Sequence, residues 1–298
     1  MQRRSFMLNG SLLLALAASS PCLAIPPFKR AKPGRMRLSL AAYSMRQYLQ
    51  PKPDEPHKMD LFDFVDYCRE QGLDGAELTS YYFPEDVDND YLVRLKQHCH
   101  VTGITITGGA IRNDFCSNDP EKLEASLAHT RQWVDRYAIL GAPAIRVFAG
   151  NQPKDEELSV TLERCAKTCQ KACDYAASKG VFLALENHGG VTAHAKDLLE
   201  IVRQVESPAL GINFDSGNFR SAADPYSELV KIAPYAVNAQ IKVEMHIDGK
   251  TVPADLSRIV QILQDSGYSG WVALEYEAQE NPLEAIPKWL GELRQRLS

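Results

Sequence analysis

The sequence lacks the features that mark several large classes of protein. No tract rich in Lys and Arg occurs beyond residue 37, and the 298-residue chain has a formal net charge of −5. Proteins that bind the phosphate backbone of nucleic acids usually present a basic surface, so no nucleic-acid partner is expected. The apolar run near the N-terminus is shorter than the roughly 20 residues that a membrane-spanning helix needs. We therefore also expect no membrane span in the mature chain.

Cysteine pairs with the spacing of zinc or redox sites are missing as well. None of the seven cysteines forms a CxxC pair. Cys165, Cys169 and Cys173 recur every four residues, which predicts one face of a helix and small side chains buried in the core. An exported protein can form disulfides, but the sequence assigns no pairing.

The first 24 residues have the pattern of an export signal. Arg3 and Arg4 precede an apolar run and a stretch of small residues that ends at Ala24, as in a signal peptide with a cleavage site. The arginine pair resembles a twin-arginine signal, which directs the export of folded proteins. We predict a signal over residues 1–24, a tether over 25–36 and one domain over 37–298, located in the periplasm or secreted. The alternative is an uncleaved N-terminal anchor. Removing the two arginines makes the charge of the mature chain −7.

From residue 37 onward, short apolar runs typical of strands alternate with longer amphipathic stretches. Eight strands are expected, and they cover Arg37–Tyr43, Gly75–Leu78, Ile104–Thr107, Ala144–Phe148, Val181–Leu185, Leu210–Phe214, Val237–Ile241 and Trp271–Leu274. The stretches between them repeat apolar residues at steps of three and four, which predicts helices. Several end in a glycine that suits the left-handed turn after a helix, namely Gly72, Gly103, Gly141, Gly180 and Gly267.

Eight strand–helix units in about 260 residues predict a (β/α)8 TIM barrel of the α/β class. A doubly wound open sheet would usually carry a glycine-rich phosphate loop after its first strand. The segment LAAYSMRQYL at residues 40–49 has no such loop. No change in composition divides the mature chain, so a single domain is expected.

Acidic residues stand at the ends of three predicted strands. Glu186, Asp215 and Glu275 would meet at the mouth of the barrel, where the carboxyl ends of the strands converge. Like charges brought together need a neutralising proton or cation. Carboxylate oxygens suit Mn²⁺, Mg²⁺ or Co²⁺, with Zn²⁺ as a further candidate. Gln240 would complete a four-ligand set through its amide oxygen, or serve only as a hydrogen-bonding amide of the core. Each acid taken alone is compatible with a helix cap or a salt bridge.

Other polar and aromatic residues at the strand ends are candidates for contacts with a substrate. The predicted substrate-binding residues are Tyr43, Glu77, Arg146, His188, Asn218 and Lys242. Glu77 and Arg146 have an alternative, which is to pair with each other inside the barrel. Tyr43, Tyr81, Tyr82 and Phe148 would supply an apolar wall for a sugar ring, or else pack against one another. Arg112 and Asn113 in the segment GGAIRNDFC would reach a hydroxylated ligand, or else the segment is only a turn.

Five segments carry a resemblance to a known family. They are GLDGAEL at residues 72–78, LALENH at 183–188, INFDSGN at 212–218, QIKVE at 240–244 and GYSGWVALEYE at 267–277. In this order and spacing they resemble the sugar phosphate isomerase/epimerase family, the xylose-isomerase-like TIM barrels that include ketose 3-epimerases. The superfamily also contains inosose dehydratases, lyases that act on oxidised glycosides, and endonuclease IV-like nucleases with histidine-rich zinc sites. This sequence has few histidines at its strand ends, which disfavours the nuclease branch.

The resemblance implies roles for individual residues. Glu186, Asp215 and Glu275 match metal-ligand positions, and Glu186 and Glu275 match the acid/base pair of the epimerases. Gln240 stands where the family usually has a histidine ligand, and Asn218 replaces a second frequent histidine. An amide in place of an imidazole weakens the affinity for zinc-like metals.

The residues and the resemblance together predict a metal-dependent sugar isomerase or epimerase with a small-molecule sugar or sugar derivative as substrate. Removal of a proton next to a carbonyl would give an enediolate that a divalent ion stabilises. The alternatives are a keto-sugar or 3-keto-glycoside lyase or dehydratase that uses the same site, and a noncatalytic carbohydrate-binding barrel. The sequence leaves open whether the protein forms a homo-oligomer.

Overall fold

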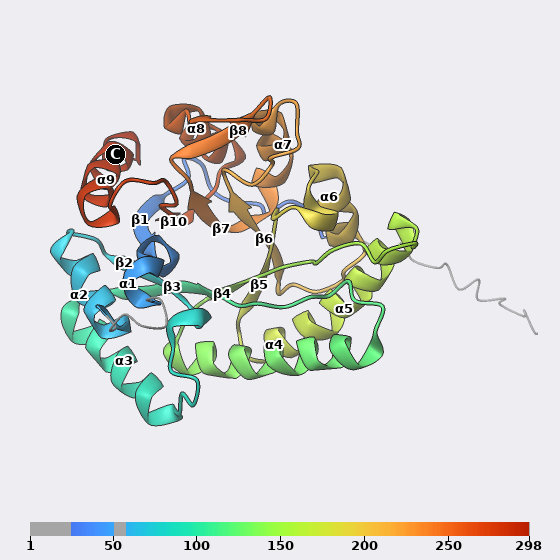
Figure 1. Cartoon of the computed structure of the whole chain (residues 1–298), viewed down its shortest axis with the longest axis horizontal. Helices are drawn as coiled ribbons and strands as arrows, with labels where there is room; N and C mark the ends of the chain where they lie inside the picture. Colours follow the sequence, from blue (N-terminus) through green and yellow to red (C-terminus); the bar gives the residue numbers. More distant parts are fainter. Residues whose placement is uncertain (1–24, 51–57, 298) are drawn as a thin grey trace, which may run out of the picture.

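The chain folds into a closed barrel of parallel strands surrounded by helices (Figure 1). The structure is a computed structural model and describes residues 25–50 and 58–297. Within these residues, eight strands close in the order β1-β10-β7-β6-β5-β4-β3-β2. The predicted TIM barrel and its α/β class are confirmed. The proposed signal peptide lies outside the described residues.

All eight predicted strands are present. The barrel strands are β1 (Met36–Ala41), β2 (Gly75–Thr79), β3 (Thr105–Ala110), β4 (Ala144–Val147), β5 (Phe182–Glu186), β6 (Leu210–Asp215), β7 (Ala236–Ile241) and β10 (Gly270–Leu274). Their ends differ from the prediction by no more than three residues. The largest difference is in β3, which continues through Gly108 and Gly109. Glycine is needed at 109 because a side chain there would collide with the ring of Tyr137.

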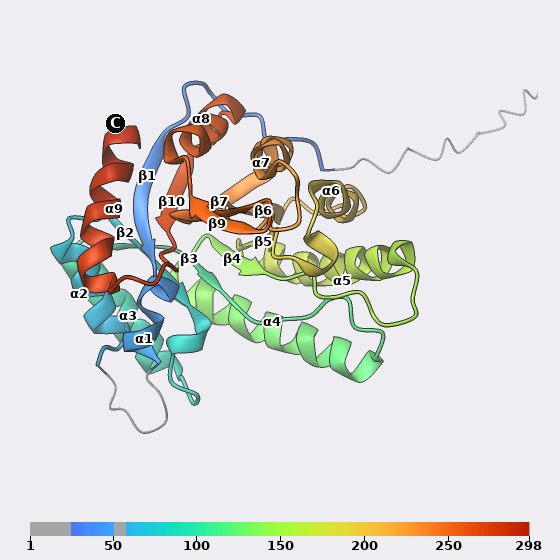
Figure 2. The ribbon, with the colours of Figure 1, turned by 45° about the horizontal axis from the view of Figure 1, so that its top comes forward.

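The helices cover the outside of the barrel (Figure 2). They are α1 (Arg46–Leu49), α2 (Leu61–Glu70), α3 (Asn89–Thr102), α4 (Pro120–Leu140), α5 (Leu158–Ser178), α6 (Ala195–Arg203), α7 (Pro225–Ile232), α8 (Leu256–Ser266) and α9 (Pro282–Leu297). The five glycines expected after helices all have φ between 66° and 80°, which confirms the left-handed turns. Among the described residues, no helix is long and apolar enough to span a membrane.

The cysteine stripe is part of the core. Cys165, Cys169 and Cys173 lie buried on the inner face of α5, as predicted. The cysteines of the described segments are all unbridged.

The sequence did not predict a hairpin that follows β7. Strands β8 (Glu244–Ile247) and β9 (Lys250–Pro253) pair antiparallel, and the turn between them has Asp248 and Gly249 at positive φ. The hairpin begins directly after Lys242 and Val243, so it extends the chain at the carboxyl end of β7.

Of residues 25–36, predicted as a tether, Met36 already belongs to β1, and the others dock against the amino-terminal end of the barrel. The ring of Phe28 packs edge-on against Phe182 at the start of β5, with 6.2 Å between centroids. Arg30 donates a hydrogen bond of 2.6 Å to the carbonyl of Ala236 at the start of β7, and its guanidinium lies over the rings of Phe28 and Tyr268. This segment thus contacts β5, β7 and the loop before β10.

This docking predicts a stability effect for Phe28. Replacing Phe28 by Ala removes a half-buried ring, and we expect the free energy of unfolding to fall by about 1–3 kcal/mol. Thermal and denaturant unfolding followed by circular dichroism measures it. Lys29→Ala, at an exposed neighbouring position, is the control and should be neutral. Equal midpoints for the two variants would show that the Phe28 ring contributes nothing to the stability of the fold.

Candidate functional site

A polar cavity of about 350 Å³ opens at the carboxyl ends of the barrel strands. It is lined by acids, cations and aromatic rings together: Glu186, Glu275, Glu277, Arg112, Arg146, Arg220, Lys242, Tyr43, Tyr81, Phe148, His188 and Asn218. Most of the residues predicted from the sequence to contact the substrate or to take part in catalysis line this cavity. Asp215, Gln240 and Glu77 are buried next to it and do not line it.

The register of the strands determines which side chains meet at the mouth. Strand β10 pairs Ala273 with Gln240 and Leu274 with Ile241, so Glu275 comes level with Lys242. Residues two apart on a strand face the same side, so Gln240 lies one layer deeper in the barrel than Lys242. Gln240 was expected beside Glu275, and the structure places Lys242 there.

Lys242 lies at the centre of the acidic cluster. Its ammonium nitrogen is 2.5 Å from an oxygen of Glu275, 2.6 Å from one of Glu277 and 3.0 Å from one of Asp215. Burial lowers the pKa of Lys242, but the three carboxylates outweigh burial and hold its pKa well above the usual value. The carboxylates thus favour the charged form of Lys242, and its ammonium lies among the acids for which the sequence predicts a metal ion.

Glu186 also lines the cavity, and it is paired with Arg146 and His188 instead of Lys242. Its Oε2 lies 3.4 Å from Nε of Arg146 and 3.1 Å from Nδ1 of His188. Burial raises the pKa of Glu186, yet Arg146, His188 and Lys242 together bring its pKa down to about 2. Burial, opposed by Lys242, leaves the pKa of Glu275 above its ordinary value. The two glutamates of the predicted acid/base pair thus face one cavity in different electrostatic surroundings.

Arg146 and His188 are held by their other contacts. Arg146 donates to the carbonyl of Ile111 and to the hydroxyl of Tyr81, and its guanidinium lies 3.9 Å from the centre of the Phe148 ring. The imidazole of His188 packs against the same ring, with 4.2 Å between the Phe148 and His188 centroids. Asn218 lies 3.2 Å from Nδ1 of His188.

A buried hydrogen-bonded layer lies beneath the cavity. Gln240 donates to Glu77 at 2.6 Å, and its amide oxygen accepts from Asn213 at 2.6 Å. Asn238 donates to the second oxygen of Glu77 at 2.7 Å, and Asn213 also donates to Glu186 at 3.2 Å. Burial raises the pKa of Glu77 to about 7. Glu77 bonds to the amides of Asn238 and Gln240 and not to Arg146, and it lies beneath the cavity.

The predicted metal-ligand set does not fit this geometry. The amide oxygen of Gln240 is already an acceptor within the buried layer, and Glu186 is turned toward Arg146 and His188. Asp215 and Glu275 instead converge on the Lys242 ammonium. Throughout the described segments, no three His, Cys, Asp or Glu side chains are placed to hold an ion together. The positive charge nearest to Asp215 and Glu275 in this structure is the Lys242 ammonium.

Of the aromatic and loop residues expected to contact a ligand, some line the cavity and others do not. Tyr43, Tyr81 and Phe148 line the cavity, as an apolar wall would. Arg112 also lines it and stacks over Tyr81 at 4.3 Å. Asn113, in contrast, exchanges two hydrogen bonds with the backbone of Phe148 and so fixes that loop instead of reaching a ligand.

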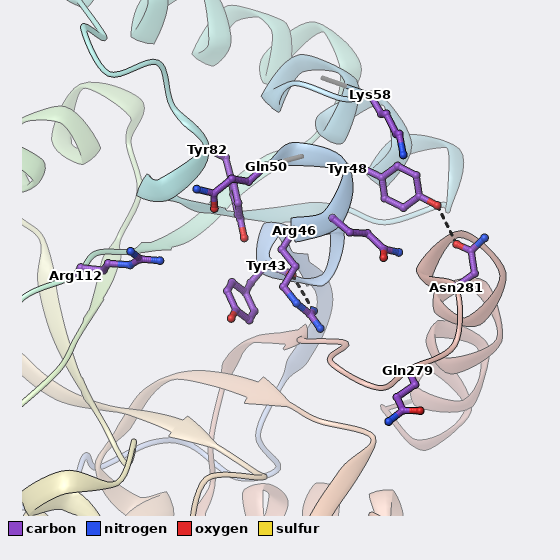
Figure 3. Close-up of a pocket in the computed structure, with 10 residues that line it drawn as sticks. Tyr43, Arg46, Tyr48, Gln50, Lys58, Tyr82, Arg112, Gln279 and Asn281 are labelled. Carbon is purple, nitrogen blue, oxygen red and sulfur yellow. Dashed lines mark hydrogen bonds between the residues drawn. The ribbon is translucent and has the colours of Figure 1, made fainter. Parts of the chain in front are cut away.

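A second, larger groove adjoins the cavity. Its volume is about 730 Å³, and it shares Tyr43 and Arg112 with the cavity. Figure 3 shows Tyr48, from α1, facing Asn281 at the start of α9, with a hydrogen bond of 3.0 Å between them. Arg46 also lines the groove and donates to the carbonyls of Tyr276 and Glu277. This groove was not predicted from the sequence, because its residues come from several separate segments, including α1 and the residues around 279–281, that share no recognisable motif.

Comparisons with known proteins agree on the fold. The sequence profile of the family described as "Xylose isomerase-like TIM barrel" matches residues 65–294. No curated protein matches the chain.

Solved structures with the same fold match at low sequence identity. D-psicose 3-epimerase from Clostridium cellulolyticum H10, solved with D-tagatose, is 17% identical, covers 88% of this chain and 100% of its own, and has a TM-score of 0.71. The E. coli protein YcjR, a 3-keto-D-glucoside 4-epimerase, is 16% identical over 88% and 100% of the two chains, with a TM-score of 0.67. The IOLI protein with a bound zinc atom is 17% identical over 88% and 96%, with a TM-score of 0.71.

The family profile spans most of the chain, and the closed barrel carries a polar site at the expected end. This chain belongs to the xylose isomerase-like TIM barrel family.

Proposed function

We propose that this protein is an isomerase or epimerase of a sugar or sugar derivative, and that it acts by moving a proton next to a carbonyl group. The observation that carries the proposal is the placement of two carboxyl groups across one polar cavity. Glu186 ends β5 and Glu275 follows β10, with β6 and β7 between these strands in the barrel. Two of the structural neighbours are named as epimerases of D-psicose and of a 3-keto-D-glucoside, that is, of a sugar and of a sugar derivative.

The chemistry follows from two carboxyl groups and the cations near them. One carboxylate takes the proton from the carbon next to the carbonyl, and the C–H electron pair forms a C=C bond while the carbonyl pair moves onto oxygen. A second carboxyl group returns a proton to the opposite face, which gives epimerisation, or to the neighbouring carbon, which gives isomerisation. The protein must stabilise the enediolate oxygen that forms between the two transfers.

The cavity also explains how a sugar would be oriented. Arg112, Arg146 and Arg220 offer N–H donors to hydroxyl groups along its wall. Tyr43, Tyr81 and Phe148 present ring faces against which the apolar side of a sugar ring can pack. Both kinds of contact are needed because a sugar has polar edges and an apolar face.

The location of the protein is a proposal that rests on the sequence. The twin-arginine pattern of residues 1–24 supports export to the periplasm or beyond. Phosphorylated sugars are mainly cytoplasmic, so an exported enzyme would act on free, oxidised or glycosidically linked sugars. Fractionation of the native host cells, followed by mass spectrometry of the mature N-terminus, tests this location.

Replacing either glutamate tests the proposed chemistry. Glu186→Gln and Glu275→Gln keep the size of the side chain but remove the proton-transfer group, and each should lower kcat by about 10²–10⁴-fold. The assay incubates the protein with a panel of free, oxidised and glycosidic sugars in D₂O and follows deuterium incorporation by NMR. Glu244→Gln, at an exposed position of the β8–β9 hairpin, is the matched control. A near-normal rate in either active-site variant would remove that glutamate from the mechanism.

A lyase acting on keto-glycosides is the second candidate, and the adjoining groove favours it. The groove begins at Tyr43 and Arg112, so a second sugar or an aglycone could extend into it from a ring bound in the cavity. After proton removal, the electron pair would expel the glycosidic oxygen from the β-carbon, and the departing alkoxide would take up a proton. The product would be an unsaturated keto-sugar and a free alcohol.

The groove makes a prediction about substrate size. Tyr48→Ala removes a ring from the groove wall and the hydrogen bond to Asn281, so we expect KM for a glycosidic substrate to rise about tenfold with kcat preserved. KM for the free monosaccharide should not change. Tyr48→Phe, which keeps the ring, should give a smaller effect. An equal rise in KM for both substrates would show that the groove does not separate them. Binding of these sugars without turnover, in wild type and variants alike, would favour a carbohydrate-binding barrel.

A further inference from the structure

The mouth of the barrel holds three acids that require a positive charge close by. Asp215, Glu275 and Glu277 each have an oxygen within 3.0 Å of the same nitrogen, and that nitrogen belongs to Lys242. We propose that the Lys242 ammonium takes the place of the divalent cation, so that this enzyme neutralises its acids and stabilises the enediolate oxygen without a metal ion. The catalytic part of this inference rests on the proposed function.

The structure is built around the stem of this lysine. Gly217 lies beside it, and a Cβ atom at Gly217 would come within 2.7 Å of Cδ of Lys242 and 3.1 Å of its Cβ. The backbone N–H of Lys242 donates to the hydroxyl of Ser216 at 2.8 Å. The backbone N–H of Gly217 donates to Asp215 at 2.8 Å, which fixes the carboxylate that faces the ammonium. The lysine is therefore held by the turn after β6, and the whole residue is only 7% exposed.

The ammonium has the donors that the reaction needs. It carries three N–H groups, and hydrogen bonds to Glu275 and Glu277 use two of them. The third can turn to Oδ2 of Asp215, which is buried without a hydrogen-bond donor, or to an oxygen in the cavity. A donor already in place where negative charge develops stabilises the transition state without rearrangement.

The alternative, an ion added beside the lysine, would find few oxygens free of a partner. Gln240 and Asn213 bond to each other, and Oε2 of Glu186, which accepts no hydrogen bond, is ion-paired with Arg146 at 3.4 Å and with His188 at 3.1 Å. The oxygens that remain, on Asp215, Glu275 and Glu277, surround the ammonium. A divalent ion would have to displace the lysine to reach them.

The first experiment measures metal binding and metal dependence on the full-length mature protein. Calorimetric titration of EDTA-treated, dialysed wild type with MnCl₂ should show no stoichiometric binding. The same treated protein should keep its turnover of the active sugar within about twofold, with or without added Mn²⁺ or Zn²⁺. Stoichiometric Mn²⁺ binding by wild type, or a rate lost to EDTA and restored by metal, would overturn the inference.

The second experiment removes the ammonium. Lys242→Ala should lower kcat by about 10²–10³-fold, and added methylammonium should restore part of the rate, because a small amine fits the space that the side chain leaves. Without its counter-charge, the acidic cluster should gain affinity for Mn²⁺ that wild type lacks. Lys250→Ala, at an exposed position of strand β9, is the control and should match wild type. An unchanged rate in Lys242→Ala would refute the catalytic role.

The outcomes separate this inference from the proposed function. If no sugar in the panel is turned over under any condition, the proposed function fails, and the Mn²⁺ titrations of wild type and Lys242→Ala still decide whether the ammonium replaces a metal. If Lys242→Ala does not fold, the EDTA treatment and titration of wild type decide it. Turnover that requires metal refutes the inference and leaves the isomerase or epimerase proposal intact.

Discussion

The contact between the Lys242 ammonium and its three carboxylates is the interaction on which the site depends. A parallel barrel directs all of its strand ends to one mouth, and in this chain several of those ends carry acids. Such a cluster is stable only if a proton or a cation neutralises it, because like charges in a buried site raise the energy of one another, and in this structure the nearest cation is Lys242. The fold therefore accommodates many charged side chains at its mouth on the condition that the lysine stays in place.

The layer beneath the mouth explains why the cation can be an amine. Gln240 and Asn238 close the barrel interior by bonding both oxygens of Glu77, and Asn213 connects this layer to Glu186. Amides and one carboxyl group satisfy one another there, and a buried polar network of this kind tolerates few substitutions. Gln240 of β7 is occupied by these hydrogen bonds. The next inward-facing residue, Lys242, is therefore the one that contacts Asp215 and Glu275.

Much of the architecture could be predicted from the sequence, but the residue-by-residue pairing between neighbouring strands could not. Apolar periodicity and the glycines after helices were sufficient for the barrel, since each signal is local. The acids Glu186 and Glu275 were found because they stand at strand ends. The difference concerns Gln240 and Lys242: both face inward, and only the pairing of β7 with β10 shows which one lies level with Glu275. The hairpin after β7 was missed for a similar reason, because two four-residue strands leave little pattern.

The turn after β6 brings Gly217 into contact with Lys242, which is distant in the sequence. A Cβ atom at Gly217 would meet Cδ and Cβ of Lys242 and the backbone carbonyl of Glu244, so a side chain at 217 would force the stem of Lys242 to move. A related chain with a lysine level with Lys242 should therefore keep a glycine at the position of Gly217, since the turn and the lysine stem share one space.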